Sequence, residues 1–485
     1  MGILHPLHSH GLLRYECKKP GRTSMSQHFD AVVIGTGQGG SPLAVRLAES
    51  GRRTAIIERH LFGGTCVNVG CTPTKTYVAS ARAAHVARTA AQYGVMIGGD
   101  IRIDMARVKA RKDEVIGGSR TGIEKWLRGT HNLTVFKGHG RFTGPRALSI
   151  EAADGSTQEI DADLIIINTG TRAVVPKVDG LERVPYLTNS TILELTEVPE
   201  HLVIVGASYI ALEFGQMFRR FGSRVTLLVR GERILTREDE DVARAMQDVF
   251  VREGIDFRFG AEMSRVEPMA GGVRIVSGDD EVIDASHLLF ATGRTPNTDD
   301  LGLEHAGIAV NRHGMIDVDG QLRTKVDGVY ALGDVNGRGA FTHTSWNDYE
   351  IIASNLLDGE SRSVDTRIMA YAVFVDPPFA RVGMSEEDVR RDGREALIAT
   401  MPMSRVGRAR ERGETDGFMK ALVDARTKRF LGAAIYGIEG DEAIHAFIDI
   451  MNADAPYTTL QRAMHIHPTV SELIPTLLEG LTPFE

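Results

Sequence analysis

Residues 29–40 read FDAVVIGTGQGG, an apolar run that ends in glycines with the spacing G-x-G-x-x-G. The run has the length of a buried strand, and the residues that follow it, SPLAVRLAESG, have the pattern of a helix closed by a glycine. RTAIIE is then a second strand, which ends at Glu58. A strand, a glycine-rich loop, a helix and a strand with an acid at its end together predict a dinucleotide-binding unit.

Each glycine of this loop is expected to serve the dinucleotide in a different way. Gly35 permits the tight turn after the strand. Gly37 lets a pyrophosphate approach the backbone at the N-terminus of the helix, where free amide groups attract an anion. Gly40 lets the helix pack closely on the strand, and Glu58 can accept hydrogen bonds from ribose hydroxyls.

The same pattern returns in the second quarter of the chain. Residues 201–206, HLVIVG, predict a strand, a loop and helix follow, and residues 223–229, SRVTLLV, predict the next strand. Gly206, Ser208 and Ala211 stand where the three glycines would be. Two dinucleotide units in one chain imply two nucleotides whose reactive ends meet, and we expect a tightly held flavin and a nicotinamide.

The end of the later strand indicates which nicotinamide is used. Val229 stands where an NAD-preferring site usually places an acid that holds the 2′-hydroxyl. Arg230 follows at once and Arg233 lies three residues further, so both are candidates to bind the 2′-phosphate of NADPH. The alternative is that both are solvated surface charges, with Glu232 weakening their field.

Between the two units lies GGTCVNVGCTPTK, residues 63–75, which holds two of the three cysteines of the chain. On a regular helix, Cα atoms five residues apart are about 8–9 Å from each other, whereas a disulfide needs roughly 4.4–6.8 Å. Oxidation of Cys66 and Cys71 therefore requires a bend, which Gly70 can provide. Pro73 suits the first position of a following helix, so Cys71 is expected at a helix N-terminus, where a thiolate is favoured.

Two other roles for the cysteine pair are open. A zinc site needs about four ligands, and the nearby His60 and His85 have no ligand spacing to offer, so we predict no bound metal. An inert buried pair is the second alternative, because cysteine is often buried. Beside a dinucleotide fold, redox chemistry is the preferred hypothesis.

Composition limits the class of protein. The chain is 42% hydrophobic and 25% charged, which is typical of a globular protein, and its net charge of −8 argues against general binding to nucleic acid. No apolar run reaches the length of a membrane span. Scarce cysteine favours a reducing compartment, so we expect the cytoplasm. Residues 1–24 resemble a disordered extension or an upstream start, and we assign no role to Cys17.

From about residue 29 to its end, the chain resembles the flavin-dependent pyridine nucleotide–disulfide oxidoreductases, which include glutathione reductase, lipoamide dehydrogenase and mercuric reductase. GGTCVNVGCTPTK is similar to the redox-active disulfide motif of that family. The resemblance implies that Cys66 exchanges with substrate and that Cys71 contacts the flavin. It also implies that Lys75 lies near the flavin, that Glu213 pairs with it, and that Tyr209 gates the nicotinamide pocket.

Further motifs carry the resemblance along the chain. TGTRAVVP (169–176) and ATGRTPN (291–297, with Gly293) are similar to the crossings between the two nucleotide domains. GVYALGDVNG is similar to the segment whose aspartate, here Asp334, holds the ribityl chain of the flavin. Gly140 stands where relatives approach the adenine end through the backbone.

The last third of the chain resembles the interface domain of the family. In relatives, the histidine before the proline of HIHPTVSE reaches the disulfide of the partner subunit, and the acid five residues later orients it. These residues are His467 and Glu472, while His465 is expected to be a bystander. The resemblance therefore implies a homodimer whose active sites are each built from two chains.

The implied fold class is α/β, with two Rossmann-like dinucleotide-binding domains and a C-terminal α+β dimerisation domain. We expect the FAD-binding domain at 25–176 and 298–360, the NAD(P)-binding domain at 177–297 and the dimerisation domain at 361–485.

The implied function is an FAD-dependent oxidoreductase that passes electrons from NADPH through the flavin and the Cys66–Cys71 disulfide to a small disulfide or a thiol-bound metal ion. CTPTKTYVASA and FTHTSWNDY (341–349) resemble mercuric-reductase-like members, yet no cysteine follows Cys71 to pass on a metal ion. A lipoamide-type dehydrogenase and a quinone- or oxygen-reducing flavoprotein remain alternatives. We predict that His343 either tunes the flavin or is a packed histidine with satisfied hydrogen bonds.

Overall fold

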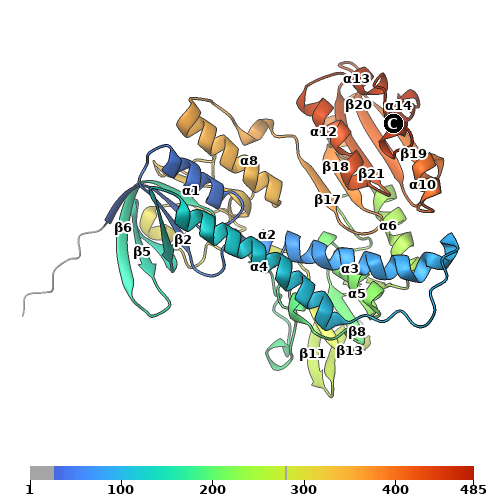
Figure 1. Cartoon of the computed structure of the whole chain (residues 1–485), viewed down its shortest axis with the longest axis horizontal. Coiled ribbons are helices and arrows are strands. Elements are labelled where there is room, and N and C mark those ends of the chain that lie inside the picture. The colour runs from blue at the N-terminus through green and yellow to red at the C-terminus, as the bar shows by residue number, and fades with distance from the viewer. Residues whose placement is uncertain (1–26, 279–280) are drawn as a thin grey trace, which may run out of the picture.

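The computed structural model describes residues 27–278 and 281–485. The expected extension at residues 1–24, and Cys17 within it, lie outside the described residues. Three larger sheets organise the described residues (Figure 1), and two smaller sheets of three and two strands accompany them, so the predicted α/β class is confirmed. Among the described residues, no helix is both long and apolar enough to cross a membrane.

The first sheet is built around the first glycine-rich loop. Its strands lie in the order β3-β2-β1-β6-β5-β4, and β16 pairs with β6 from far along the chain. The strands are β1 (Gln27–Ile34), β2 (Thr54–Glu58), β3 (Leu133–Lys137), β4 (His139–Gly144), β5 (Ala147–Glu151), β6 (Thr157–Ile167) and β16 (Val329–Ala331).

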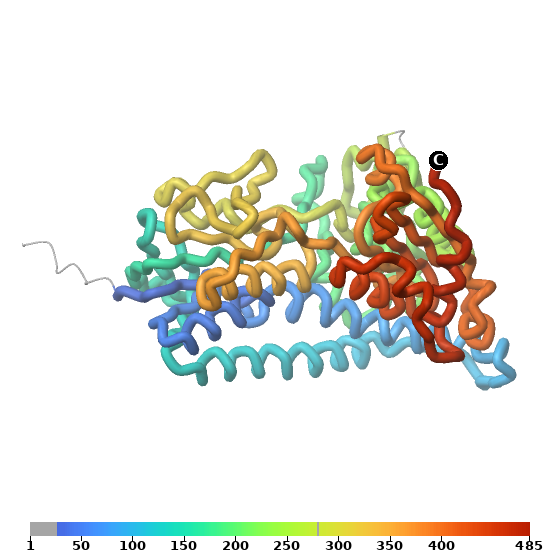
Figure 2. Tube along the Cα trace, turned by 90° about the horizontal axis from the view of Figure 1, so that it is seen from above, coloured from blue at the N-terminus to red at the C-terminus, as the bar shows by residue number. Residues whose placement is uncertain are grey.

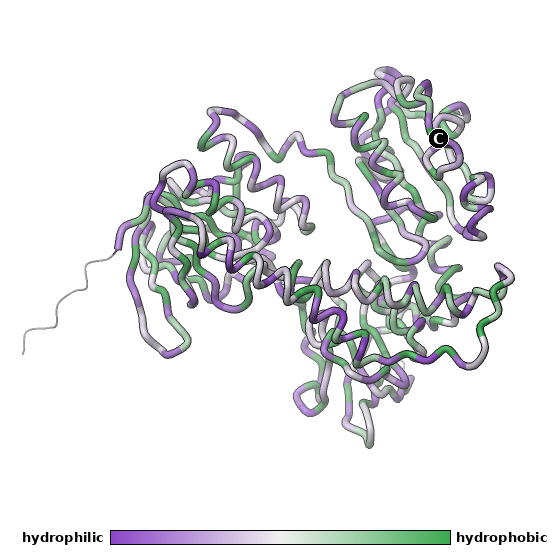
Figure 3. Tube along the Cα trace, in the orientation of Figure 1, coloured by the Kyte–Doolittle hydropathy of each residue, from purple (hydrophilic) through white to green (hydrophobic). Residues whose placement is uncertain are grey.

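Both faces of this sheet are covered, which explains why β1 and β2 are continuous apolar runs. On one face pack α1 (Gly40–Glu49) and α8 (Thr342–Ala353), which lie side by side in Figure 1. On the other face, side chains from the sheet's own antiparallel strands β4 and β5 and from the short α7 (Leu303–Ala306) pack against β1, β2 and β6. Figure 3 shows the hydrophobic residues gathered along the strands of each lobe.

The second sheet is parallel, in the order β10-β9-β8-β14. A three-stranded antiparallel sheet, β11-β12-β13, packs on one of its faces, and α5 (Tyr209–Phe221) and α6 (Glu240–Arg252) pack on the other. The strands are β8 (His201–Val205), β9 (Arg224–Val229), β10 (Asp256–Phe259), β11 (Met263–Met269), β12 (Gly272–Ser277), β13 (Val282–Ala285) and β14 (His287–Phe290).

The chain passes between the first and second sheets at one place. β7 (Thr171–Ala173) and β15 (Arg294–Pro296) pair in an antiparallel two-stranded sheet. These strands belong to the two stretches that resemble the family's domain crossings, and they lie side by side although more than a hundred residues separate them. The second sheet is therefore an insertion that leaves the first sheet and returns to it at the same point.

The third sheet holds the C-terminal part of the chain, with strands in the order β17-β18-β21-β20-β19-β22 and all pairs antiparallel. Its strands are β17 (Ala370–Val373), β18 (Phe379–Gly383), β19 (Ala396–Pro402), β20 (Phe418–Asp424), β21 (Phe430–Tyr436) and β22 (Thr482–Pro483). Its helices are α9 (Glu386–Asp392), α10 (Gly407–Glu411), α11 (Gly440–Ala443), α12 (His445–Asn452), α13 (Tyr457–Gln461) and α14 (Ile474–Glu479).

Two long helices connect the first sheet with the second. α3 (Cys71–Thr89) and α4 (Met105–Gly129) pack together, and Figure 2 shows α4 running along the length of the molecule. The short α2 (Gly64–Asn68) precedes α3. Because α3 begins at the second cysteine, the long helix starts in the middle of the motif that carries both cysteines.

Candidate functional site

The first glycine-rich loop has the close contacts that its glycines permit. Gly35 has φ +104°, and a Cβ there would lie 2.3 Å from the carbonyl oxygen of Asn168. A Cβ on Gly40 would lie 2.4 Å from the carbonyl oxygen of Gly35, and one on Gly37 would lie 2.7 Å from Oδ1 of Asn168. Side chains at these positions would clash, so the loop presents bare backbone at the N-terminus of α1.

Glu58 ends β2 beside this loop, as the sequence predicts. The backbone N–H and the hydroxyl of Thr36 donate hydrogen bonds to one carboxylate oxygen, at 3.1 and 2.5 Å, and the N–H of His60 donates to the other at 2.7 Å. The side chain is buried. These donors hold the carboxylate in one orientation at the wall of the cavity, where ribose hydroxyls can reach its remaining lone pairs.

A cavity of about 1370 Å³ joins the glycine-rich loop to the cysteines. Gly140 and Asp334 line it, together with Glu58 and Lys75. Asp334 accepts a hydrogen bond from the Thr171 hydroxyl at 2.9 Å, and burial raises the pKa of its carboxyl. The volume, the bare glycine loop and the two carboxylates fit a flavin dinucleotide, with Asp334 and Glu58 as acceptors for ribityl and ribose hydroxyls.

The two cysteines lie at a break between helices. Cys66 is in α2 and Cys71 is the first residue of α3, while Gly70 between them has φ −130° and ψ −117°. The bend that the sequence predicts between the two cysteines is thus present at Gly70. The predicted start of the helix at Pro73 is wrong by two residues, because the helix begins at Cys71 and Pro73 occupies its first turn, where the missing N–H removes no helical hydrogen bond.

The two thiols have unequal acidity. A hydrogen bond from Cys66 is the largest of the effects that lower the pKa of Cys71 to about 6. Thr342, whose Oγ1 lies 3.2 Å from Sγ of Cys71, and the charge of Lys75 act in the same direction, whereas burial opposes them. The pKa of Cys66 is raised, chiefly by the same hydrogen bond. Cys71 therefore holds the negative charge of the reduced pair, and Cys66 holds the proton.

Lys75 and Glu213 form the ion pair that the resemblance implies. Nζ of Lys75 lies 2.8 Å from Oε2 of Glu213 and 4.5 Å from the ring centroid of Phe374. The backbone N–H of Phe374 donates to the other oxygen of Glu213 at 3.0 Å. Glu213 is 3% exposed. Because both oxygens of this buried carboxylate are occupied, the ammonium group has a fixed place on the cavity wall beside Cys71.

The N-terminal end of α8 forms another wall of the cavity. His343 donates a hydrogen bond from Nε2 to the carbonyl oxygen of Ala370 at 2.7 Å and stacks on Phe341, with ring centroids 5.4 Å apart. Burial lowers the pKa of His343. His343 thus lines the cavity with its Nε2 satisfied by a hydrogen bond, and a role in tuning the flavin stays a prediction.

The second glycine-like loop has the same form with one glycine fewer. Gly206 has φ +133°, and a Cβ there would lie 2.4 Å from the carbonyl oxygen of Ala291. Ser208 is exposed and caps α5, and Ala211 is fully buried against the core. Tyr209 begins α5 and lines the cavity, with its ring centroid 6.0 Å from that of Phe341. Tyr209 therefore lies where the loop of the second unit meets the cavity, and its implied role in gating the nicotinamide pocket stays a prediction.

The two candidate arginines for a 2′-phosphate differ in their surroundings. Arg230 is exposed at the end of β9, directly after the buried Val229. Arg233 is half-buried, and its guanidinium donates to the carbonyl oxygens of Glu238 at 2.8 Å and Thr236 at 3.1 Å. Arg233 therefore stabilises the conformation of its own loop, whereas the guanidinium of Arg230 is exposed to solvent. Gly293, in the return crossing, has φ +132°.

His467 and Glu472 are paired, but they lie away from the cysteines of their own chain. Nδ1 of His467 donates to Oε2 of Glu472 at 2.7 Å, and the histidine side chain is 82% exposed. Within the described ranges, neither residue lines the cavity that holds Cys66 and Cys71. The His467–Pro468 bond is cis. An oriented and exposed imidazole of this kind is available to a second chain.

Two buried polar residues that support the cavity were not predicted. Asn168 accepts a hydrogen bond from the N–H of Gly40 at 3.0 Å and donates to the carbonyl oxygen of Leu332 at 3.1 Å. Asp348, 1% exposed, accepts from the N–H of Gly333 at 2.8 Å and forms an ion pair with Arg367. Asn168 directly follows β6, and a polar residue directly after an apolar run was the available signal.

Two family profiles match the chain. That of the pyridine nucleotide-disulphide oxidoreductases covers residues 29–348, and that of the dimerisation domain of the same family covers residues 369–478. The second match supports assembly as a homodimer.

Curated relatives cover nearly the whole chain. The probable pyridine nucleotide-disulfide oxidoreductase RclA of Escherichia coli is 38% identical over 92% of this chain and 97% of its own length. A mercuric reductase of Streptomyces lividans is 32% identical over 94% of this chain and 96% of its own. A dihydrolipoyl dehydrogenase of Chlamydia muridarum is 32% identical over 93% of this chain and 96% of its own.

Solved structures agree with these relatives. The Cu(II) complex of the HOCl-induced flavoprotein disulfide reductase RclA from Escherichia coli superposes with a TM-score of 0.86, at 36% identity, over 94% of this chain and 99% of the other. A likeness of this extent covers the glycine-rich loops, the cysteine pair and the C-terminal sheet together. The chain belongs to the pyridine nucleotide-disulphide oxidoreductases, enzymes that use FAD and NAD(P)H.

Proposed function

We propose that the enzyme passes electrons from NADPH through FAD and the Cys66–Cys71 pair to a thiol-bound metal ion or a small disulfide. The observation that carries the proposal is the unequal pair itself. Sγ of Cys71 lies 3.2 Å from Oγ1 of Thr342 at the wall of a cavity of dinucleotide size, and its pKa is lowered to about 6, chiefly by a hydrogen bond from Cys66, which is half-buried beside it. Such an arrangement suits a thiolate that stays with the cofactor and a thiol that meets the substrate.

The residues of the chain account for each electron and proton in disulfide reduction. Bound FAD supplies two-electron redox chemistry between the nicotinamide and the cysteines. Cys66 then gives its proton to His467 of the partner subunit and attacks one substrate sulfur, and the first thiolate product leaves with that proton. Cys71 attacks Cys66, the second thiolate leaves, and the Cys66–Cys71 disulfide forms again.

A metal ion can accept the same two electrons, as one Hg(II) or as two Cu(II) ions reduced to Cu(I). Two likenesses support this acceptor: the Cu(II) complex of RclA and the identity with a mercuric reductase. Soft thiolates suit both metals. We further assign FAD to residues 25–176 and 298–360, the nicotinamide to 177–297 and the dimer interface to 361–485. Scarce cysteine makes the cytoplasm the compartment that we propose.

A substrate panel with NADPH tests this function. It contains glutathione disulfide, lipoamide, coenzyme A disulfide, mercuric and cupric ions and a quinone, and each is assayed with the wild-type enzyme and the Cys66→Ser variant. Turnover of a metal ion or disulfide that the variant loses supports the proposal. Oxidation of dihydrolipoamide by NAD as the fastest reaction would instead identify a lipoamide-type dehydrogenase, and quinone turnover that survives Cys66→Ser would identify a quinone reductase.

Asp334→Ala is expected to weaken the binding of FAD. A hydrogen bond to a charged group contributes roughly 1.5–3 kcal/mol, so the dissociation constant should rise about 10- to 100-fold. The constant is measured by titrating the apoprotein with FAD and following flavin fluorescence. The matched control is Asp327→Ala, whose side chain is 97% exposed beside the same strand, β16. Equal affinities for both variants would remove Asp334 from the proposed site.

Arg230→Ala is expected to raise the KM for NADPH and to leave the KM for NADH nearly unchanged. Loss of one charge-assisted contact of arginine with the 2′-phosphate corresponds to about a 10- to 100-fold change. Arg224→Ala is the matched control, because Arg224 is exposed at the opposite end of the same strand, β9. Arg230 does not determine a preference for NADPH if the wild-type enzyme uses both nucleotides equally well. The same conclusion follows if Arg230→Ala raises the KM for both nucleotides equally.

A further inference from the structure

The strand β17 connects the loop after β9 with the wall of the cysteine cavity. Tyr371 lies on this strand, and its hydroxyl donates a hydrogen bond to the carboxylate of Glu238. Burial, together with the nearby carboxylate, raises the pKa of Tyr371. The phenol therefore stays protonated across the working pH range and keeps donating to Glu238.

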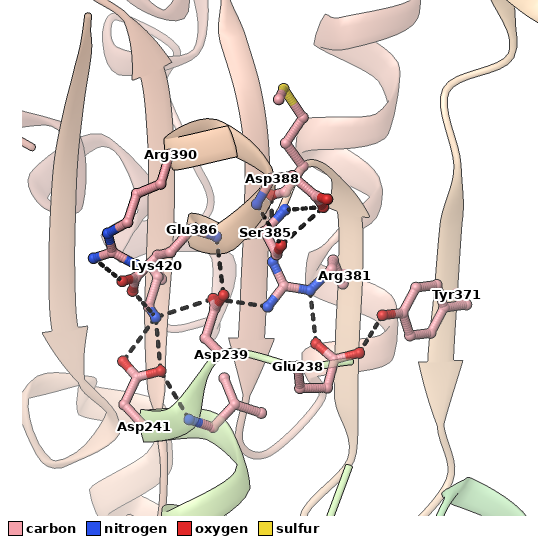
Figure 4. Close-up of polar contacts among 12 residues, drawn as sticks. Glu238, Asp239, Asp241, Tyr371, Arg381, Ser385, Glu386, Asp388, Arg390 and Lys420 are labelled. Atoms are coloured by element: carbon pink, nitrogen blue, oxygen red, sulfur yellow. Dashed lines mark hydrogen bonds and ion pairs between the residues drawn. The ribbon is translucent and has the colours of Figure 1, made fainter. Parts of the chain in front are cut away.

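The acceptor of this hydrogen bond is fixed by a buried network of charges (Figure 4). Nε of Arg381 donates to Glu238 at 2.7 Å, and another guanidinium nitrogen donates to Asp239 at 2.8 Å. Lys420 donates to Asp239 at 3.1 Å. Glu238, Asp239, Arg381 and Lys420 are all buried. Displacing one member would leave a buried charge unpaired, which is costly, so Glu238 is a rigid anchor for Tyr371.

The ring of Tyr371 is the first of a stack of three. It lies parallel to the ring of Phe341, with centroids 5.4 Å apart and an interplanar angle of 3°. Phe341 stacks in turn on His343, at 5.4 Å and 7°. His343 is itself tied to the carbonyl oxygen of Ala370, the neighbour of Tyr371 on β17. Two adjacent residues of β17 thus hold the N-terminal end of α8.

Thr342 lies in the chain between the two stacked residues of α8. Its Oγ1 is 3.2 Å from Sγ of Cys71, a distance at which a small displacement of the hydroxyl weakens the contact. The backbone of Thr342 cannot shift while Phe341 and His343 are held on both sides. The placement of this hydroxyl therefore depends on β17.

We propose that Tyr371 is a positioning residue for the redox cysteines. Glu238 fixes its hydroxyl, its ring fixes Phe341, and Thr342 is thereby aimed at the sulfur of Cys71. The inference rests on the proposed redox role of Cys71. Tyr371 acts through Phe341 and Thr342 rather than by touching a reacting atom.

The other groups that act on Cys71 are Cys66 on α2, Lys75 on α3, and Glu213 and Tyr209 on α5. Glu213 accepts a hydrogen bond from the N–H of Phe374, directly after β17, and Tyr209 packs on Phe341. Because Tyr371→Phe keeps the ring and the backbone of β17, it leaves both contacts in place and removes the link to Glu238.

The experiment follows the titration of Cys71 directly. Full-length, FAD-loaded protein carrying Cys66→Ser, with and without Tyr371→Phe or Tyr371→Leu, is alkylated with iodoacetamide at a series of pH values, and the Cys71 peptide is quantified by mass spectrometry. Tyr371→Phe keeps the ring and removes the link to Glu238. Because a hydrogen bond to the thiolate is weakened, the midpoint should move to higher pH by about half a unit or more, and further with Tyr371→Leu.

Tyr436→Phe is the matched control. Tyr436 lies on β21 of the same sheet, is 1% exposed, and its hydroxyl has no hydrogen-bond partner in the part of the chain that the structure describes. Its loss should leave the midpoint unchanged. The proposal is overturned if both Tyr371 variants titrate like Tyr436→Phe, including the case in which they only lower the melting temperature. The midpoint needs no substrate, so a failed substrate panel would not affect this test.

Discussion

Cys66→Ser is expected to abolish reduction of a disulfide or a thiol-bound metal ion, lowering kcat/KM by about 1000-fold or more. Cys66 holds the proton of the reduced pair and is the thiol that we propose attacks the substrate. A serine hydroxyl cannot form the Cys66–Cys71 disulfide, so electrons that reach the flavin have no path to the disulfide or metal-ion substrate. Steady-state oxidation of NADPH with the acceptor identified by the panel measures this loss.

The same variant should still accept hydride from NADPH. Stopped-flow bleaching of the flavin absorbance measures that step alone, and its rate should remain within about threefold of the wild type, because the proposed nicotinamide contacts lie on β9 and α5. Cys17→Ser, which changes the remaining cysteine of the chain, is the matched control for cysteine loss. Full turnover of the substrate by Cys66→Ser would show that the cysteines only assist.

His467→Ala is expected to lower turnover about 100-fold or more, because a positioned general acid–base group contributes 10²–10⁴-fold. Glu472 orients its imidazole through Nδ1, and we propose that Nε2 exchanges a proton with Cys66 of the other chain. His465→Ala is the matched control, since Nδ1 of His465 donates a hydrogen bond to the carbonyl oxygen of Ser471 at 2.7 Å. Steady-state turnover of both variants with the same acceptor decides the comparison.

Mixing two inactive variants tests whether the site spans two chains. After subunit exchange between Cys66→Ser and His467→Ala, the mixed dimer contains one intact site, with Cys66 from one protomer and His467 from the other. Up to a quarter of wild-type activity is expected from equal amounts, since about half of the dimers are mixed and each has one of two sites. If native mass spectrometry shows mixed dimers and no activity returns, the assignment across chains is wrong.

The local parts of the site could be predicted from sequence because their reasons are local. Gly35 and Gly206 have positive φ angles, Gly40 lies against the carbonyl oxygen of Gly35 five residues earlier, and the cysteine motif supplies its own helix break. The positions of Cys66 and Cys71 on either side of that break follow from the spacing alone. Family resemblance added the pairing of Lys75 with Glu213, which are 138 residues apart.

Contacts between distant segments could not be predicted from patterns in the sequence. Nothing around Asn168 in the sequence shows that Gly40 will need an acceptor, because the need arises only when β6 pairs with β1. Arg230 and Arg233 look equivalent in sequence, yet in the folded chain Arg233 donates hydrogen bonds to the backbone of its own loop. Tyr371 contacts Phe379 on the next strand, β18, but its hydroxyl and the face of its ring depend on two distant elements, the loop before α6 and the start of α8.

The pairing of β16 with β6 sets an order of events during synthesis. About 160 residues separate the end of β6 from the start of β16, and the whole second sheet is encoded between them. At 5–20 residues per second, a ribosome takes roughly 8–30 s to cover that length. The nascent chain thus exposes an unpaired edge of β6, and lacks Asp334 and α8, until the inserted unit has emerged. The inserted unit can fold first, and the flavin can be captured only afterwards.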